Sequence, residues 1–242
     1  MNLLVHETPQ ELAEAAARDF AAKAEAAIGE RGRFTVVLAG GSTPRRAYEL
    51  LAGDDYAGRV DWPRVHVFFG DERTVPPDHG DSNYRMAHEA LLSHVPVGSI
   101  HRMRGELPPA EAAAAYEEEL REFFGASDEP PSFGLVLLGI GEDGHTASLF
   151  PNTPALDVTD HWVAANPVEK LRTVRLTLTV PVLNAARATS FLVAGEDKAG
   201  AMKGILEGDA DPREYPAKLV RSASGPVWMV DRAAASSLET SS

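Results

Sequence analysis

The stretch Val36-Val37-Leu38-Ala39-Gly40-Gly41-Ser42-Thr43-Pro44, residues 36–44, runs from an apolar strand through two glycines into a helix. A hydroxyl side chain followed by Pro44 at the first helical position predicts a capped helix start. Such a turn leaves backbone N–H groups at the positive end of a helix, and glycines let an anion approach them closely. Gly41, Ser42 and Thr43 are therefore candidate phosphate ligands, although a tight turn with a helix cap is the simpler alternative. The lysine of a nucleoside-triphosphate loop is missing.

Apolar runs alternate with helical patterns along the rest of the chain. Continuous Val, Leu and Phe runs separated by helices predict an α/β fold: a mostly parallel, Rossmann-like open sheet with helices on both faces. Arg172–Val180 alternates apolar with polar residues, which favours a half-exposed edge strand or a small antiparallel addition. The expected strands are Phe34–Ala39, Val65–Phe69, Gly134–Leu138, Trp162–Ala165, Thr189–Ala194 and Val227–Val230, and the expected helices are 9–28, 44–52, 82–93, 109–124 and 196–207.

Length and composition exclude several classes of protein. The 242 residues include 23 Lys+Arg, 36 Asp+Glu and no Cys, and the formal net charge is −13. The absence of cysteine excludes a disulfide scaffold, a thiolate zinc site and a thiol nucleophile. A negative balance opposes non-specific binding to nucleic acid or to an anionic membrane surface. We find neither a membrane-spanning run nor a signal-peptide pattern, and no repeat or long linker, so we expect one cytoplasmic domain over residues 1–242.

Charged residues follow two more of the predicted strands. Asp71-Glu72-Arg73 comes directly after Val65–Phe69. These charges either form an ion pair that shapes a loop or leave Arg73 to hold a hydroxyl, a carboxylate or an oxyanion. Lys198 lies near the start of a predicted helix, where it opposes the helix dipole, so it is a candidate phosphate ligand unless its acidic neighbours satisfy it.

A glycine-rich turn follows the strand Gly134–Leu138. Residues 139–145 read Gly-Ile-Gly-Glu-Asp-Gly-His and contain the dinucleotide-binding pattern G-x-G-x-x-G. That pattern requires a helix of about three turns after the last glycine, but Pro151 allows barely two. The turn is better interpreted as presenting His145 at a strand end, where an adjoining acid such as Asp143 can fix the tautomer of a general base. A structural histidine is the alternative.

Taken together, these stretches resemble the 6-phosphogluconolactonase family. The matching segments are Gly40–Pro44, Phe69–Pro76, Asp81–Tyr84, Gly139–Pro151, Arg175–Asn184 and Val193–Lys198, in the order that the family has them. The resemblance implies hydrolysis of 6-phospho-D-glucono-1,5-lactone to 6-phosphogluconate in the oxidative pentose phosphate pathway, without a metal or an organic cofactor. The implied partner is this small sugar phosphate, with no nucleic acid or membrane, and the protein is expected to be a monomer or a weak homo-oligomer.

The resemblance also implies roles for individual residues. His145, assisted by Asp143, takes a proton from the attacking water, and Arg73 holds the reacting end of the lactone. Lys198 and the amides of Gly41, Ser42 and Thr43 hold the phosphate. Arg175 is a further contact to phosphate or substrate.

Two alternatives remain at this stage. Glucosamine-6-phosphate deaminases have a similar Gly-x-Asp-Gly-His loop, but they carry an acid where this chain has Phe150 and an aromatic residue at the place of Arg73. A sugar-phosphate-binding regulator without catalysis is the second alternative. Such regulators carry a fused DNA-binding module, and about 34 residues before the first predicted strand leave no room for one.

Overall fold

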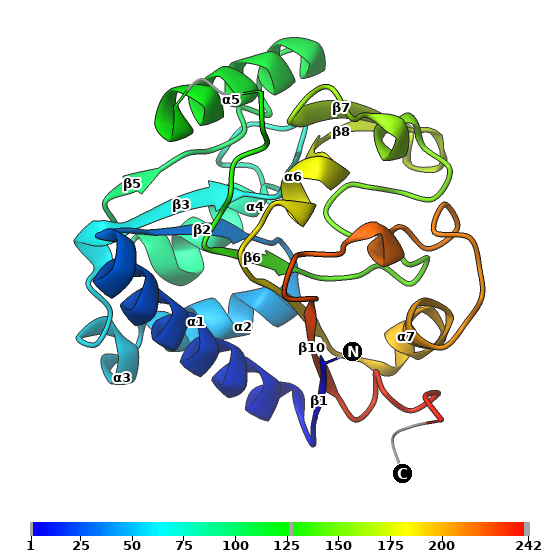
Figure 1. The fold of residues 1–242 in the computed structure, drawn as a ribbon, viewed down its shortest axis with the longest axis horizontal. Coiled ribbons are helices and arrows are strands. Elements are labelled where there is room, and N and C mark those ends of the chain that lie inside the picture. The colour runs from blue at the N-terminus through cyan, green and yellow to red at the C-terminus, as the bar shows by residue number, and fades with distance from the viewer. Residues whose placement is uncertain (1, 126–127, 240–242) are drawn as a thin grey trace.

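The computed structural model describes residues 2–125 and 128–239. Its centre is a seven-stranded sheet in the order β1-β10-β9-β6-β2-β3-β5, and every pair of neighbouring strands is parallel (Figure 1). The strands are β1 (Asn2–His6), β2 (Phe34–Leu38), β3 (Val65–Phe69), β5 (Ser99–Ile100), β6 (Leu135–Leu138), β9 (Thr189–Val193) and β10 (Val227–Asp231). The helices are α1 (Pro9–Arg31), α2 (Ser42–Ala52), α3 (Asp54–Ala57), α4 (Asn83–Ala87), α5 (Pro109–Phe124), α6 (Val180–Asn184) and α7 (Ala199–Leu206).

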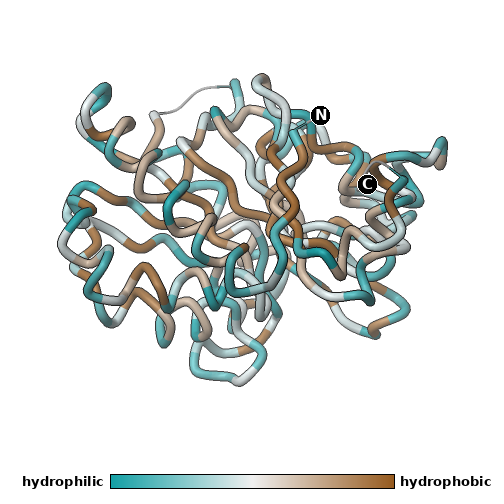
Figure 2. Tube along the Cα trace, turned by 90° about the horizontal axis from the view of Figure 1, so that it is seen from below, coloured by the Kyte–Doolittle hydropathy of each residue, from teal (hydrophilic) through white to brown (hydrophobic). Residues whose placement is uncertain are grey.

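Apolar layers cover both faces of this sheet, which confirms the predicted α/β architecture. Successive strand residues point to opposite faces, so Val36 and Leu38 join the cluster of α1 and α2, whereas Val37 joins that of α5 and α7. Hydrophobic segments run through the middle of the molecule and hydrophilic ones lie around them (Figure 2). The inner strands β2, β3, β6 and β9 are buried from both sides, as expected for a parallel sheet.

A second, three-stranded antiparallel sheet has the order β4-β8-β7, with β4 (Asp71–Arg73), β8 (Thr173–Leu178) and β7 (Val163–Val168). The antiparallel addition predicted at Arg172–Val180 is therefore confirmed, although β8 is the central strand of this sheet and not an edge. The assignment of Trp162–Ala165 to the main sheet is wrong, because that run begins β7. A short apolar run does not reveal which sheet it joins.

The sequence analysis missed three strands: β1, β4 and the two-residue β5, which pairs with β3. In β1, Leu4 and Val5 are each 42% exposed at the sheet edge, so no buried apolar run marks the strand. The strand β4 consists of three charged residues and is held by its pairing with β8. In all three strands tertiary pairing outweighs local propensity.

The helix starts agree with the predictions in one case and differ in another. Thr8 caps α1 by accepting a hydrogen bond from the Glu11 amide at 3.2 Å, and the helix begins at Pro9, the first residue of the predicted range. The helix α2 begins at Ser42 instead, after Gly41 at φ 103°, and no side-chain hydrogen bond caps it. The predicted hydroxyl cap and proline start are therefore wrong. A glycine with positive φ makes the turn, and the first amides of α2 remain available to a ligand.

Two other predicted helices cover nearly their expected residues, but each changes its helix type along the way. The predicted helix 82–93 is α4 followed by a π-helical turn over His88–Leu92, and the predicted helix 196–207 is a 3₁₀ turn, Glu196–Lys198, followed by α7. Within residues 2–125 and 128–239, no helix has the length and apolar character to cross a membrane.

Candidate active site

The candidate site lies between β2 and β6, where the order in which the chain adds strands to the main sheet reverses. From β2 the sheet continues through β3 to β5 on one side and through β6 to β9 and β10 on the other. Ligands of open α/β sheets bind beyond the carboxyl ends of the strands at such a point. A cleft of about 580 Å³ is found there. Six predicted site residues line it: Gly41, Arg73, Asp143, His145, Arg175 and Lys198.

The two remaining predicted residues lie beside this cleft. Ser42 and Thr43 line an adjoining pocket of about 190 Å³, which shares Gly41 and Lys198 with the main cleft. The start of α2 and Lys198 thus come together, as the phosphate-cradle prediction requires. Arg45 in the first turn of α2 forms a surface ion pair with Glu49 at 2.9 Å.

His145 is held by the loop that follows β6. Its Nδ1 lies 2.5 Å from Asp143 Oδ1, and its ring stacks on Phe150 with the ring centres 4.1 Å apart. Gly141 makes this close packing possible, because a Cβ at that position would overlap the imidazole ring. The loop therefore fixes the ring on three sides and leaves Nε2 as the nitrogen not engaged with Asp143.

The surroundings of His145 keep its imidazole neutral. Burial lowers the pKa of His145 to about 4; Asp71 acts in the opposite direction, and the cations Lys198, Arg175 and Arg73 lower the pKa further. At neutral pH the ring then carries one hydrogen, and the contact with the Asp143 carboxylate assigns it to Nδ1. The lone pair of Nε2 is available to accept a proton.

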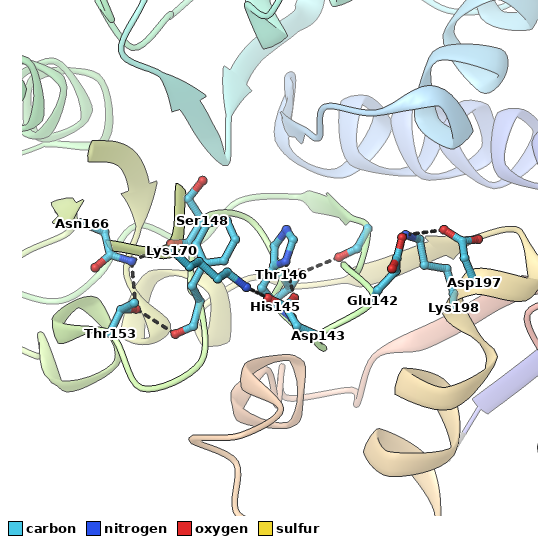
Figure 3. A network of polar contacts seen from close by, with 12 residues as sticks. Glu142, Asp143, His145, Thr146, Ser148, Thr153, Asn166, Lys170, Asp197 and Lys198 are labelled. Atoms are coloured by element: carbon cyan, nitrogen blue, oxygen red, sulfur yellow. Dashed lines mark hydrogen bonds and ion pairs between the residues drawn. The ribbon is translucent and has the colours of Figure 1, made fainter. Parts of the chain in front are cut away.

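Turns held by side-chain hydrogen bonds follow His145, and no helix starts within residues 145–153, in line with the argument against a dinucleotide site. Thr146 Oγ1 donates to the Gly139 carbonyl at 2.8 Å. Asn166 of β7 donates to the Ser148 carbonyl at 2.8 Å and to Thr153 Oγ1 at 2.9 Å (Figure 3). Ala147 has a φ of 46°, a left-handed conformation that such bonds help to hold and that often occurs at functional sites.

Two arginines face each other across the antiparallel sheet. Arg73 of β4 and Arg175 of β8 are direct partners in the strand register. The guanidinium of Arg73 donates to the carbonyl oxygen of Asp81, while the Nε of Arg175 is buried and has no hydrogen-bond partner among the described residues. Burial, and next the charge of Arg73, lower the pKa of Arg175. An anionic group in the cleft would offset both effects.

Glu72, the acid directly before Arg73, has structural partners. Glu72 is buried and accepts hydrogen bonds from the amides of Asn83 at 2.7 Å and Tyr84 at 2.8 Å, so its carboxylate anchors the start of α4. Ser82 caps this helix by accepting a hydrogen bond from the Arg85 amide. Glu72 therefore shapes the loop through backbone amides and not through the ion pair with Arg73 that was one of the two interpretations.

Lys198 has acidic partners on two sides. Its Nζ lies 2.8 Å from Asp197 Oδ2 and 3.9 Å from Glu142 Oε1, and the side chain is 22% exposed (Figure 3). The acidic neighbour that the sequence offered as an alternative partner is thus in contact. A phosphate at Lys198 would have to compete with Asp197.

The sequence analysis missed four residues of the cleft: Asp71, Ser148, Phe150 as a packing partner, and Lys170. Ser148 Oγ donates to Asp71 Oδ2 at 2.6 Å. Asp71 adjoins Arg73 at a strand end, a signal that could have identified it. Nothing in the local sequence marks Lys170. Among the described residues, no group of three or more His, Cys, Asp or Glu side chains is placed to hold a metal ion.

Comparisons with known proteins agree with this fold and cleft. A family model described as glucosamine-6-phosphate isomerases/6-phosphogluconolactonase matches residues 7–229. The chain is 44% identical over 216 residues to a 6-phosphogluconolactonase of Synechocystis, covering 88% of each chain. It is 41% identical over 237 residues to the human 6-phosphogluconolactonase, covering 96% of this chain and 91% of the other. The structure of 6-phosphogluconolactonase from Trypanosoma brucei superposes with a TM-score of 0.85 at 32% identity, covering 98% of both chains. The chain therefore belongs to the glucosamine-6-phosphate isomerase/6-phosphogluconolactonase family.

Proposed function

We propose that the protein hydrolyses 6-phospho-D-glucono-1,5-lactone to 6-phosphogluconate, the lactone-opening step of the oxidative pentose phosphate pathway, with His145 activating the attacking water. The observation that carries the proposal is a neutral imidazole in the cleft, with Nδ1 held by Asp143 and Nε2 left to take a proton. The relatives of this chain described above are named 6-phosphogluconolactonase. A cytoplasmic location and a monomeric or weakly associated state stay predictions.

The reaction needs few groups from the protein. Water attacks the lactone carbonyl while its proton passes to Nε2 of His145, and the Arg73 guanidinium stabilises the oxyanion. When the tetrahedral intermediate collapses, the bond from the carbonyl carbon to the ring oxygen breaks, and His145 returns its proton to that oxygen. A protonated imidazole with a low pKa is a stronger acid than an ordinary imidazolium. The burial that makes His145 a weaker base therefore makes its protonated form a better proton donor in this second step.

The charge of a bound substrate is expected to change the pKa of His145. Because Lys198, Arg175 and Arg73 lower the pKa of His145, a bound phosphate that offsets their charge raises it again. The proposed phosphate ligands are Lys198 and the first amides of α2, with Arg175 as a further contact. Remote binding energy from the phosphate then positions the ester beside His145.

This coupling predicts two different titrations of one imidazole. NMR of the protein alone should show His145 protonated only as the pH falls through about 4. With saturating 6-phosphogluconate the midpoint should move to higher pH. A His145→Gln variant identifies the resonance. A midpoint at the ordinary 6.5 in the free protein would contradict the electrostatic account of the cleft.

Replacing Lys198 with alanine should act on phosphate recognition. We expect KM for the phosphorylated lactone to rise about 10- to 100-fold, because a charge-assisted contact is lost. The kinetics on unphosphorylated gluconolactone should change little. Lys203→Ala is the matched control, since Lys203 lies in α7 and pairs with Glu239 at the surface. An equal loss on both lactones would remove Lys198 from the phosphate site.

The activity itself is tested by following 6-phosphogluconate formation from freshly prepared lactone, corrected for spontaneous hydrolysis. A rate that does not exceed the spontaneous one would refute the proposed function. Phe150 occupies the position of the acid in the deaminases and packs on His145. We therefore expect no ammonia release from glucosamine 6-phosphate in a parallel assay.

A further inference from the structure

Lys170 brings a third group to the His145–Asp143 pair. It lies on the turn Glu169–Leu171 between β7 and β8, remote in sequence from the glycine-rich loop. Its Nζ forms an ion pair with Oδ2 of Asp143, while Oδ1 of the same carboxylate contacts His145 Nδ1 (Figure 3). The ammonium also lies 5.0 Å from the centre of the Phe150 ring on which His145 stacks.

Stability does not account for this ion pair. The side chain of Lys170 is 50% exposed and that of Asp143 is 31% exposed. Ion pairs at such exposed positions contribute little to the stability of the fold, because water screens them and a long side chain must be ordered. The pair is instead placed in the cleft, with one partner in direct contact with the imidazole.

The contact between Lys170 and Asp143 instead restricts the orientation of the Asp143 carboxylate. The terminal torsion of an aspartate is broad, so a carboxylate with one fixed oxygen can still turn. A second contact on Oδ2 restricts this rotation and keeps Oδ1 directed at Nδ1. Because an ammonium group only donates hydrogen bonds, its contact with Oδ2 leaves Oδ1 as the oxygen that accepts the Nδ1 hydrogen.

The second sheet holds the turn that carries Lys170 in place. The strands β7 and β8 pair over six residues directly before and after its turn. Asn166 of β7 binds the loop that carries Phe150, through the Ser148 carbonyl and Thr153 Oγ1. The lysine turn and the histidine loop are thus connected through one buried amide side chain.

We infer that Lys170 is a positioning residue, which orients the Asp143 carboxylate so that His145 presents a free Nε2 to the substrate. The inference rests on the proposed lactonase function. It differs from a substrate-binding role, in which the ammonium would contact the phosphate or the lactone directly.

The first test separates these roles by kinetics. Lys170→Met keeps the length and removes the charge, and we expect kcat to fall roughly tenfold with little change in KM. Lys170→Arg should recover much of the loss, and Lys203→Met, which removes a similarly exposed lysine from α7, should leave kcat unchanged. A rise in KM with unchanged kcat would make Lys170 a substrate ligand and overturn the inference, as would no change in either constant.

The second test asks whether Lys170 acts through Asp143. In an Asp143→Asn background, Lys170→Met should have almost no further effect on kcat, whereas independent action would reproduce the full loss and contradict the inference. NMR provides a readout that does not depend on turnover: in Lys170→Met the share of the His145 tautomer with its hydrogen on Nδ1 should fall, and an unchanged tautomer counts against positioning. The other charged groups around this imidazole are Asp71, Arg73, Asp143, Arg175 and Lys198, and the variant leaves them all in place. An inactive wild-type protein would refute the proposed function, whereas an active wild type with a normal Lys170→Met variant refutes only the role of Lys170.

Discussion

Replacing His145 with alanine is expected to lower kcat for the phosphorylated lactone by about 10²- to 10⁴-fold, the usual contribution of a general base. The reason is that the neutral imidazole is the group of this cleft that can both accept a proton from water and return it to the ring oxygen. The affinity for 6-phosphogluconate should change much less, because the proposed phosphate ligands belong to other segments. The assay gives kcat, and calorimetry gives Kd for the product.

A matched control separates the imidazole from general effects of the substitution. His94 is exposed and does not line the cleft, and its Nε2 contacts the nearby Glu89 carbonyl oxygen, so His94→Ala should keep kcat. Unaltered turnover in His145→Ala would reject His145 as the base. A parallel loss of product binding would instead indicate that the ring also supports the shape of the cleft.

Asp143→Asn is expected to lower kcat by about 10²-fold or more. An asparagine that turns its amide NH₂ toward Nδ1 stabilises the tautomer with the hydrogen on Nε2, and that imidazole has no lone pair to offer the water. The backbone should be little affected, since the two side chains have almost the same shape. Nitrogen NMR of the imidazole reports the tautomer directly, beside the kinetic measurement.

The control for this change is Asp157→Asn, because Asp157 forms an exposed ion pair with Arg213 away from the cleft. That variant should keep full activity. If Asp143→Asn kept both its turnover and the Nδ1–H tautomer, Asp143 would have no part in orienting the base, and the inference for Lys170 would lose its foundation.

The fold could be predicted where burial alone determines the structure. The runs at β2, β3, β6 and β9 are continuous and apolar, and both faces of these strands are covered. The prediction was incomplete at β1, β4 and β5 and wrong for the placement of Trp162–Ala165, because pairing with another strand decides those segments. Helix starts depend on single dihedral angles such as that of Gly41, which the sequence does not specify.

The candidate site could be predicted in part for a related reason. Carboxyl ends of parallel strands meet at one edge, so Gly41, His145 and Lys198 share a cleft although they lie far apart in the chain. Lys170 reaches Asp143 from a turn between two antiparallel strands, whose position depends on the second sheet. No local pattern carries that information. That the whole chain forms one domain stays a prediction.

The register that sets Arg73 opposite Arg175 has a consequence for how affinity and folding are balanced. Like charges at directly opposed positions of an antiparallel pair weaken the sheet, and here one of the two guanidinium groups also has an unsatisfied buried nitrogen. An anion between them would relieve this repulsion, so under the proposed function part of the affinity for a sugar phosphate would come from the local instability of the unliganded sheet. A substitution that removes either charge would then make the pairing of β4 and β8 more stable and would lower the affinity for the ligand. At this pair of residues, a gain in fold stability is therefore expected to cost ligand affinity.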